Sequence, residues 1–200
     1  MLRRPFGCKR QRSCKGGESK KLMIASDLHG SAYYTGLLME AMEREQPQRL
    51  LLLGDLLYHG PRNDLPRDYA PKKVIEMLNG QKEKLLCVRG NCEAEVDQMV
   101  LDFPVLSEYA AVFAEGRTIY MIHGHKEWNL PLLPGNLLLR GHTHIPEIRQ
   151  VDGAYQINPG SVSIPKGGSC HGYMVLEGSG LVHKSLVDGE STLSPITFPE

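Results

Sequence analysis

The sequence lacks any apolar run close to the roughly 18 residues that a membrane span needs. Its first residues also lack the apolar stretch of a signal peptide. The five cysteines are odd in number and form no C-x-x-C pair, which argues against a disulfide framework or a structural zinc site. The composition is otherwise ordinary for a globular protein. We therefore expect a cytoplasmic protein without a membrane partner.

The absence of net charge conceals an asymmetry along the chain. Eight Lys and Arg residues against Glu18 give residues 1–21 a charge of +7, so the remainder carries −7. A negative body disfavours nucleic acid as a partner. The segment 1–19 is basic and without hydrophobic periodicity, which predicts a disordered extension. It is either a dispensable tail or an arm for targeting or for an anionic partner.

From residue 20 onward, short apolar runs alternate with amphipathic patterns. They predict strands and helices in turn, over residues 22–26, 31–45, 49–55, 70–80, 84–91 and 93–101. Ser31 is the expected N-cap of the first helix, and Gly80 is expected to end the second. Strands and helices in this order predict parallel strands joined by crossover helices.

The second half is rich in strands and tight turns. The segment EYAAVFAEGRTIYMIHG predicts a hairpin that turns at Glu115–Gly116, and further strands are predicted near 137–140, 147–151, 154–158, 172–177 and 181–187. Two facing mixed β-sheets flanked by helices would bury both sets of strands, which makes the fold class α/β. We expect a single domain over 20–200, because no repeat or linker divides it.

Polar side chains follow five of the predicted strands, each close to a glycine. They lie in SDLHG, GDLLYHG, RGNCE, IHGHK and RGHTH, and comprise Asp27, His29, Asp55, Asn91, His123, His125, His142 and His144. The carboxyl ends of strands in such sheets meet at a crevice where ligands bind. Any one of these residues alone fits a helix cap or a turn. Their coincidence at five strand ends favours a metal centre.

Imidazole and carboxylate ligands without thiolates suit zinc, manganese or iron. His142 and His144 are two residues apart, so on an extended segment their rings share one face. Seven ligand contacts, with one carboxylate shared, are too many for a single catalytic zinc. Two ions about 3.5–4 Å apart fit better, and such a pair supports displacement at phosphorus by a hydroxide that bridges them.

The ordered series D-x-H, G-D, G-N, H-G-H and G-H-T-H resembles the motifs of the calcineurin-like metallophosphoesterases. The segments ASDLHGS, LGDLLYHGPRN, VRGNCEAEVDQM and NPGSVSIPKGG are more closely similar to the small bacterial YfcE-type phosphodiesterases. The resemblance runs from about residue 20 to the last strands. It implies the α/β/β/α metallophosphoesterase sandwich, a homo-oligomer, and two divalent metal ions. Manganese is the expected metal, with zinc, iron, nickel or magnesium as the other candidates.

The resemblance also implies a role for each candidate residue. The first metal would be held by Asp27, His29 and His144, the second by Asn91, His123 and His142, with Asp55 bridging them. In catalysis, His125 would either support a ligand or contact the phosphate. The loop after the bridging aspartate would contact the substrate or support Asp55, through His59, Arg62 and Asn63.

One position departs from the pattern of the wider family, many of whose members have a histidine directly after the metal-binding asparagine. That histidine can protonate the leaving oxygen, whereas here the residue is Cys92. A thiol with a pKa of about 8.5 is a poor general acid at neutral pH. We therefore expect Asn91 and Cys92 at the reacting group and a preference for activated phosphodiesters over monoesters. Cys92 could also be a half-buried filler without a chemical role.

The sequence thus predicts a binuclear metal-dependent hydrolase of small phosphodiesters. Two alternatives are a non-catalytic interaction scaffold on the same fold and a phosphomonoesterase. All seven expected ligand positions carry residues able to bind metal. A scaffold does not need them, so the enzyme is the favoured prediction.

Overall fold

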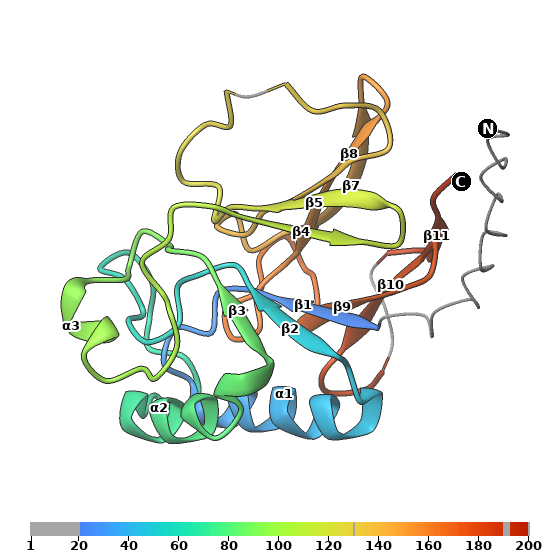
Figure 1. The fold of residues 1–200 in the computed structure, drawn as a ribbon. Coiled ribbons are helices and arrows are strands. Elements are labelled where there is room, and N and C mark those ends of the chain that lie inside the picture. The colour runs from blue at the N-terminus through green and yellow to red at the C-terminus, as the bar shows by residue number, and fades with distance from the viewer. Residues whose placement is uncertain (1–20, 130, 190–192, 200) are drawn as a thin grey trace, which may run out of the picture.

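The computed structural model describes residues 21–129, 131–189 and 193–199 (Figure 1). The basic extension predicted over 1–19 lies outside these residues. The described strands form a six-stranded sheet of order β11-β10-β9-β1-β2-β3 and a five-stranded sheet of order β4-β5-β6-β8-β7. Both sheets contain parallel and antiparallel pairs. The predicted α/β fold with two mixed sheets is therefore confirmed.

The six-stranded sheet contains the predicted parallel core. Its strands are β1 (Leu22–Ala25), β2 (Arg49–Leu52), β3 (Leu85–Cys87), β9 (Gly172–Glu177), β10 (Gly180–Ser185) and β11 (Ile196–Thr197). The parallel strands β1, β2 and β3 are connected through α1 (Ala32–Glu45) and α2 (Pro71–Asn79), and a 3₁₀ turn (Lys82–Lys84) precedes β3. The short strand β11 has no counterpart among the predicted strands.

The helix ends follow the predicted signals where those signals are local. The Ser31 hydroxyl accepts the Tyr34 N–H at 3.3 Å and so caps α1, while α2 ends directly before Gly80. By contrast, α3 (Glu95–Gln98) is much shorter than the predicted helix over 93–101. Its first predicted turn is diverted because the Glu93 carboxylate binds backbone N–H groups of other loops, among them that of Asp55.

The five-stranded sheet comes from the second half of the chain. Its strands are β4 (Ala110–Ala114), β5 (Arg117–Met121), β6 (Leu137–Leu139), β7 (Pro146–Val151) and β8 (Ala154–Pro159). The β4–β5 hairpin turns at Glu115–Gly116 as predicted, with φ of 51° and 74° at these two residues. Positive φ at both central residues is the conformation that a two-residue hairpin turn favours.

Alternate residues of the central strands face two different cores, because successive strand side chains point to opposite faces. On β1, Met23 and Ala25 pack against the helix side, whereas Leu22 and Ile24 face the second sheet. Figure 1 shows α1 and α2 covering the outer face of the six-stranded sheet. None of the described helices is long and apolar enough to cross a membrane.

The last residue of α1 connects this helix to the sheet through an ion pair in which the carboxylate is buried and the lysine is partly exposed. The Glu45 carboxylate lies 2.6 Å from Lys184 Nζ on β10 and accepts the Tyr173 hydroxyl on β9 at 3.0 Å. Burial alone would raise the pKa of Glu45, but its contacts with Lys184 and Tyr173 lower the pKa below the usual value. The charged form of Glu45 therefore stabilises the folded state.

We predict that Glu45→Gln lowers the free energy of unfolding by about 1–3 kcal/mol at pH 7, because Lys184 and Tyr173 lose a charged partner. Since the folded-state pKa of Glu45 is lowered, the difference from the wild type should shrink as the pH falls through that pKa. Urea denaturation at neutral and acidic pH measures both effects. The exposed neighbour variant Glu43→Gln is the control, and an equal effect of the two substitutions would contradict the prediction.

Candidate metal centre

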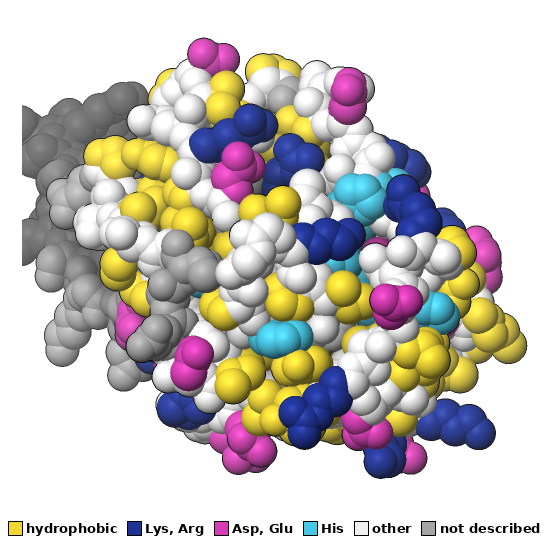
Figure 2. Space-filling view, turned by 180° about the vertical axis from the view of Figure 1, so that it is seen from behind, with side chains coloured by type: hydrophobic (Ala, Val, Ile, Leu, Met, Phe, Trp, Pro, Cys, Tyr) yellow, Lys and Arg dark blue, Asp and Glu magenta, His cyan; other side chains and the backbone are white. Residues whose placement is uncertain are grey.

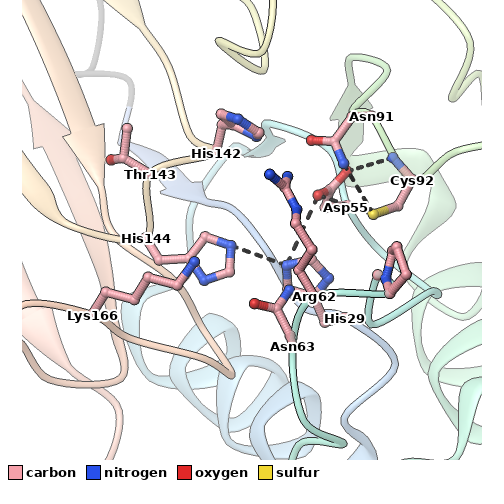
Figure 3. A pocket seen from close by; sticks show the side chains of 12 residues that line it. His29, Asp55, Arg62, Asn63, Asn91, Cys92, His142, Thr143, His144 and Lys166 are labelled. Atoms are coloured by element: carbon pink, nitrogen blue, oxygen red, sulfur yellow. Dashed lines mark hydrogen bonds and ion pairs between the residues drawn. The ribbon is translucent and has the colours of Figure 1, made fainter.

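The seven predicted ligands lie at the carboxyl ends of strands from both sheets. Asp27 and His29 follow β1, Asp55 follows β2, Asn91 follows β3, His123 follows β5, and His142 and His144 follow β6. Five of them are buried, with 3% or less of their surface exposed, whereas Asn91 and His142 lie on the open side. The structure brings all seven together around one point. Figure 3 shows those that line the cavity above this point, which are His29, Asp55, Asn91, His142 and His144.

The loops that carry these ligands have an unusual backbone. The φ angle is positive at five ligands, with values of 46° to 69° at Asp27, His29, Asp55, His142 and His144. Residues other than glycine rarely adopt this left-handed conformation. Such residues persist only where the surroundings enforce them, and they gather at functional sites. The strand β2 ends earlier than predicted for the same reason, because Gly54 and Asp55 already have positive φ angles.

The first ligand group is formed by Asp27, His29 and His144. The two Nε2 atoms are 3.2 Å apart, and Asp27 Oδ1 lies 3.6 Å from the first and 3.3 Å from the second. Each ring donates its Nδ1–H to a backbone carbonyl at 2.7 Å, His29 to Tyr58 and His144 to Ile164. In the neutral rings the Nε2 lone pairs therefore point toward each other and toward the carboxylate.

The second ligand group surrounds His123. Its Nε2 atom lies 3.1 Å from Asn91 Oδ1 and 3.3 Å from His142 Nδ1, while its Nδ1–H donates to the Leu53 carbonyl at 2.7 Å. Asp55 Oδ2 is 3.4 Å from Nε2 of His123 and 3.9 Å from Nε2 of His29. Asp55 therefore lies between the two groups, which is the position that a bridging ligand requires.

The electrostatics of this cluster call for positive charge at its centre. Asp27 Oδ1 is buried and has no hydrogen-bond partner. Burial raises the pKa of Asp27, yet its contacts with His144 and His29 lower it overall. The carboxylates in turn outweigh burial at His123 and raise its pKa to about 9. In the metal-free protein, protons on the imidazoles supply the positive charge that balances the carboxylates. Divalent metal ions can take their place, because imidazole and carboxylate groups are suitable ligands for them.

Residues outside the predicted site hold the ligand loops. The buried Glu93 carboxylate accepts the N–H groups of Asp55, Leu56 and Gly90 at 2.9, 2.7 and 2.5 Å, and so joins the loops after β2 and β3. The sequence offered no signal for this role except the position of Glu93 beside Cys92. Gly90 is required there, because a Cβ would lie 2.1 Å from Asp55 Oδ1.

The end of β8 and the loop after it hold the ligand loops from the other side. Asn158 Nδ2 donates to the Gly141 carbonyl at 2.8 Å, directly before the two histidines that follow β6. The hydroxyls of Ser161 and Ser163 donate to the Asp27 carbonyl at 2.8 and 3.1 Å. From the sequence alone, a plain turn is the favoured interpretation of NPGSVS over a role in positioning the histidine loops. In the structure this segment positions the loops that carry the candidate ligands.

A cavity of about 410 Å³ opens over the ligands (Figure 3). Besides ligands, its walls include Arg62, Asn63, Cys92, Thr143 and Lys166. Two of the three predicted substrate contacts, Arg62 and Asn63, thus line the cavity. Lys166 does so without having been predicted from the sequence.

His59, the third predicted substrate contact, does not line this cavity. Its ring packs edge-on against Tyr58 and Tyr69, with centroid distances of 4.8 and 5.2 Å. The structure thus places it behind the loop, where it can support the loop's position.

The remaining predicted catalytic residues lie in different places. Cys92 lines the cavity, with Sγ 3.3 Å from Asp55 Oδ2. Burial and the charge of Asp55 raise the pKa of this thiol well above its usual value. The ring of His125 lies outside the cavity, 5.4 Å from that of His123 and 6.3 Å from that of His142. His125 is therefore a neighbour of the second ligand group and not part of the cavity wall.

Comparison with known proteins assigns the chain that carries this site to a family. The model of the calcineurin-like phosphoesterase superfamily domain matches residues 21–180. The chain belongs to this superfamily. The resemblance of the motifs is thereby confirmed, and membership implies a centre for divalent metal ions. The groups formed by Asp27, His29 and His144 and by Asp27, Asp55 and His123 have the required donor spacing.

Individual members of the superfamily are similar over most of the chain. The chain is 48% identical over 160 residues to phosphodiesterase YfcE of Escherichia coli K12, which covers 78% of this chain and 87% of the relative. Over 160 residues it is 26% identical to a probable metallophosphoesterase of Mycoplasma pneumoniae, covering 73% and 81% of the two chains.

Solved structures agree with this assignment. The structure of YfcE from E. coli matches with a TM-score of 0.85 at 43% identity, covering 90% of this chain and all of that one. Vacuolar protein sorting 29 from Cryptosporidium parvum matches with a TM-score of 0.63 at 19% identity, covering 92% of this chain and all of that one. At that identity the second match shows a shared fold alone.

We predict that the affinity for Mn²⁺ rises with pH, because each imidazole must lose its proton to bind metal. The pKa of His123 is about 9 in the metal-free protein, so the rise should continue to about pH 9 and then level off. Calorimetric titration with Mn²⁺ in buffers of different ionisation enthalpy measures both the affinity and the protons released. His171→Gln, outside the centre, should leave the profile unchanged. An affinity that is constant between pH 7 and pH 9 would contradict the prediction.

Proposed function

We propose that the protein is a binuclear metal-dependent phosphodiesterase that hydrolyses small phosphodiesters. The observation that carries the proposal is the convergence of two ligand groups with Asp55 Oδ2 between His123 and His29. The 48% identity to the phosphodiesterase YfcE supports the same type of reaction. Manganese as the metal, a cytoplasmic location and a homo-oligomer remain predictions from the sequence.

The two ligand groups define which residues would hold the metals. We assign Asp27, His29 and His144 to one ion, Asn91, His123 and His142 to the other, and Asp55 to both. A bound pair of divalent ions stabilises negative charge on phosphoryl oxygens. It also lowers the pKa of a metal-bound water to about 7, so that hydroxide is available at neutral pH. The Tyr58, Ile164 and Leu53 carbonyls keep the three buried imidazoles oriented for this task.

The cavity walls supply the remaining interactions. The Arg62 guanidinium lines the cavity and can donate two parallel hydrogen bonds to phosphate oxygens. Asn63 Nδ2 donates to the His59 carbonyl at 2.8 Å and thereby fixes the turn that presents Arg62. A substrate that has a phosphate group held in this way is oriented before reaction, which lowers the entropic part of the barrier.

The cavity lacks a good general acid at the position directly after Asn91, where one could protonate the leaving oxygen. Cys92 is the titratable group directly after Asn91, and burial together with Asp55 raises the pKa of its thiol. A thiol with a raised pKa is a poor general acid. The chain therefore favours leaving groups that depart without a proton, such as aryloxides, over alkoxides. This preference also disfavours the alternative of a phosphomonoesterase for alkyl esters.

We predict that metal-stripped protein gains hydrolysis of bis(p-nitrophenyl) phosphate when Mn²⁺ is added and loses it with a chelator. Asp55→Asn should lower the rate by at least about a hundredfold, because both ligand groups lose their shared carboxylate. Asp102→Asn, which removes an exposed carboxylate paired with Lys82, serves as the matched control. If the folded protein is inactive with every divalent ion tested, the enzyme proposal fails and the interaction scaffold becomes the better explanation.

We predict that Cys92→His increases hydrolysis of diesters with alkyl leaving groups relative to aryl ones. An imidazole at this position can supply the missing proton, an effect of about 10²-fold or more. Cys92→Gln, which adds bulk without a titratable group, is the control. The ratio of alkyl to aryl rates is measured together with the metal content of each variant. An unchanged ratio in a fully metal-loaded Cys92→His protein would contradict the argument.

A further inference from the structure

Each of two loops beside the first ligand group both orients a histidine ring and carries a cationic side chain. The loop after β2 fixes His29 through the Tyr58 carbonyl and carries Arg62. The loop after β8 fixes His144 through the Ile164 carbonyl and carries Lys166. Each loop therefore orients one metal-binding imidazole and also brings one cationic side chain to the cavity.

The backbone around Lys166 is held firmly. The Lys166 N–H donates to the carbonyl of His144 at 3.1 Å, and the Ser169 hydroxyl donates to the Lys166 carbonyl at 2.7 Å. Lys166 and the metal-ligand loop thus form one unit. The backbone from which this cationic side chain extends is therefore fixed relative to His144.

Arg62 and Lys166 enter the cavity from opposite sides (Figure 3). Both side chains are exposed, and neither forms an ion pair with a described residue. Figure 2 shows Lys and Arg side chains standing next to exposed histidines on one face of the molecule. An unpaired guanidinium and an unpaired ammonium in one cavity suit the recognition of phosphate.

The charge of the cavity exceeds what a simple diester requires. Asp27 and Asp55 together neutralise half the charge of two divalent ions, so a bound pair already attracts the scissile group. A phosphodiester carries a single negative charge. Arg62 and Lys166 then add two positive charges that such a substrate leaves without a partner. A second phosphate on the substrate would pair with them.

We propose that Arg62 and Lys166 form a second phosphate subsite beside the metal centre. The substrate class is then a small phosphodiester that carries a further phosphate group, an assignment that rests on the proposed phosphodiesterase function. A cavity of about 410 Å³ is of the size that small-molecule ligands occupy. The charge of −7 outside residues 1–21 disfavours long polyanions, so a small phosphorylated diester is the better fit.

The first experiment compares two matched substrates, thymidine 5′-(p-nitrophenyl phosphate) and the same diester with a 3′-phosphate. The wild-type protein with Mn²⁺ should have a kcat/KM at least about tenfold higher for the phosphorylated substrate, the size of one charge-assisted contact. Lys166→Gln and Arg62→Gln should each reduce this ratio by about tenfold. Lys166→Arg should largely retain it. Lys72→Gln removes an exposed lysine at the start of α2 and should leave the ratio unchanged.

The second experiment measures binding without catalysis. Calorimetry with Mn²⁺-loaded protein should give tighter binding of thymidine 3′,5′-bisphosphate than of thymidine 5′-monophosphate, and Lys166→Gln should reduce the difference. Equal binding of the two nucleotides, or a preference that neither variant changes, would overturn the subsite. If the wild type hydrolyses neither diester, the proposed function fails, and the binding comparison still decides on the subsite. If it hydrolyses both equally and binds both nucleotides equally, the subsite fails while the function stands.

Discussion

The structure depends on one electrostatic constraint, which is that several electron-pair donors face one another at short range and need positive charge among them. The Nε2 atoms of His29 and His144 are 3.2 Å apart, and buried Asp27 Oδ1 has no hydrogen-bond partner. Such an arrangement is stable only when a cation lies among the donors. Rings that hydrogen-bond to backbone carbonyls cannot turn away from one another, so the fold preserves the need for that cation.

The two-sheet architecture is what brings these donors together. Strands of both sheets end at the same place, and their inner faces share an apolar core that includes Ile24, Leu51 and Met121. Beyond the strand ends, Glu93 joins the loops of the first sheet, while Asn158 holds the loop that follows β6. Buried hydrogen bonds of this kind fix positions that apolar packing alone leaves loose. The same loops carry the cavity walls, so the candidate ligands and the cavity lining are held by one set of hydrogen bonds.

Much of this organisation could be predicted from the sequence. Apolar periodicity located the central strands and helices, and local signals such as Ser31 and Glu115–Gly116 gave a helix start and a hairpin turn. The convergence of the candidate ligands was also predictable, because carboxylates and imidazoles followed strand ends in a recurring order. These features depend on near neighbours in the chain or on the parallel arrangement of strands, both of which leave a pattern in the sequence.

Other features were decided by contacts between residues far apart in the sequence. The first turn predicted for α3 is lost because Glu93 binds the Asp55 N–H, 38 residues away. His59 packs against Tyr69 instead of lining the cavity. Lys166 reaches the cavity because its loop binds the backbone of His144. The sequence by itself thus determined which residues can bind metal and which segments form strands and helices. Only the tertiary structure decided which side chains share the cavity, because that depends on how separate loops pack.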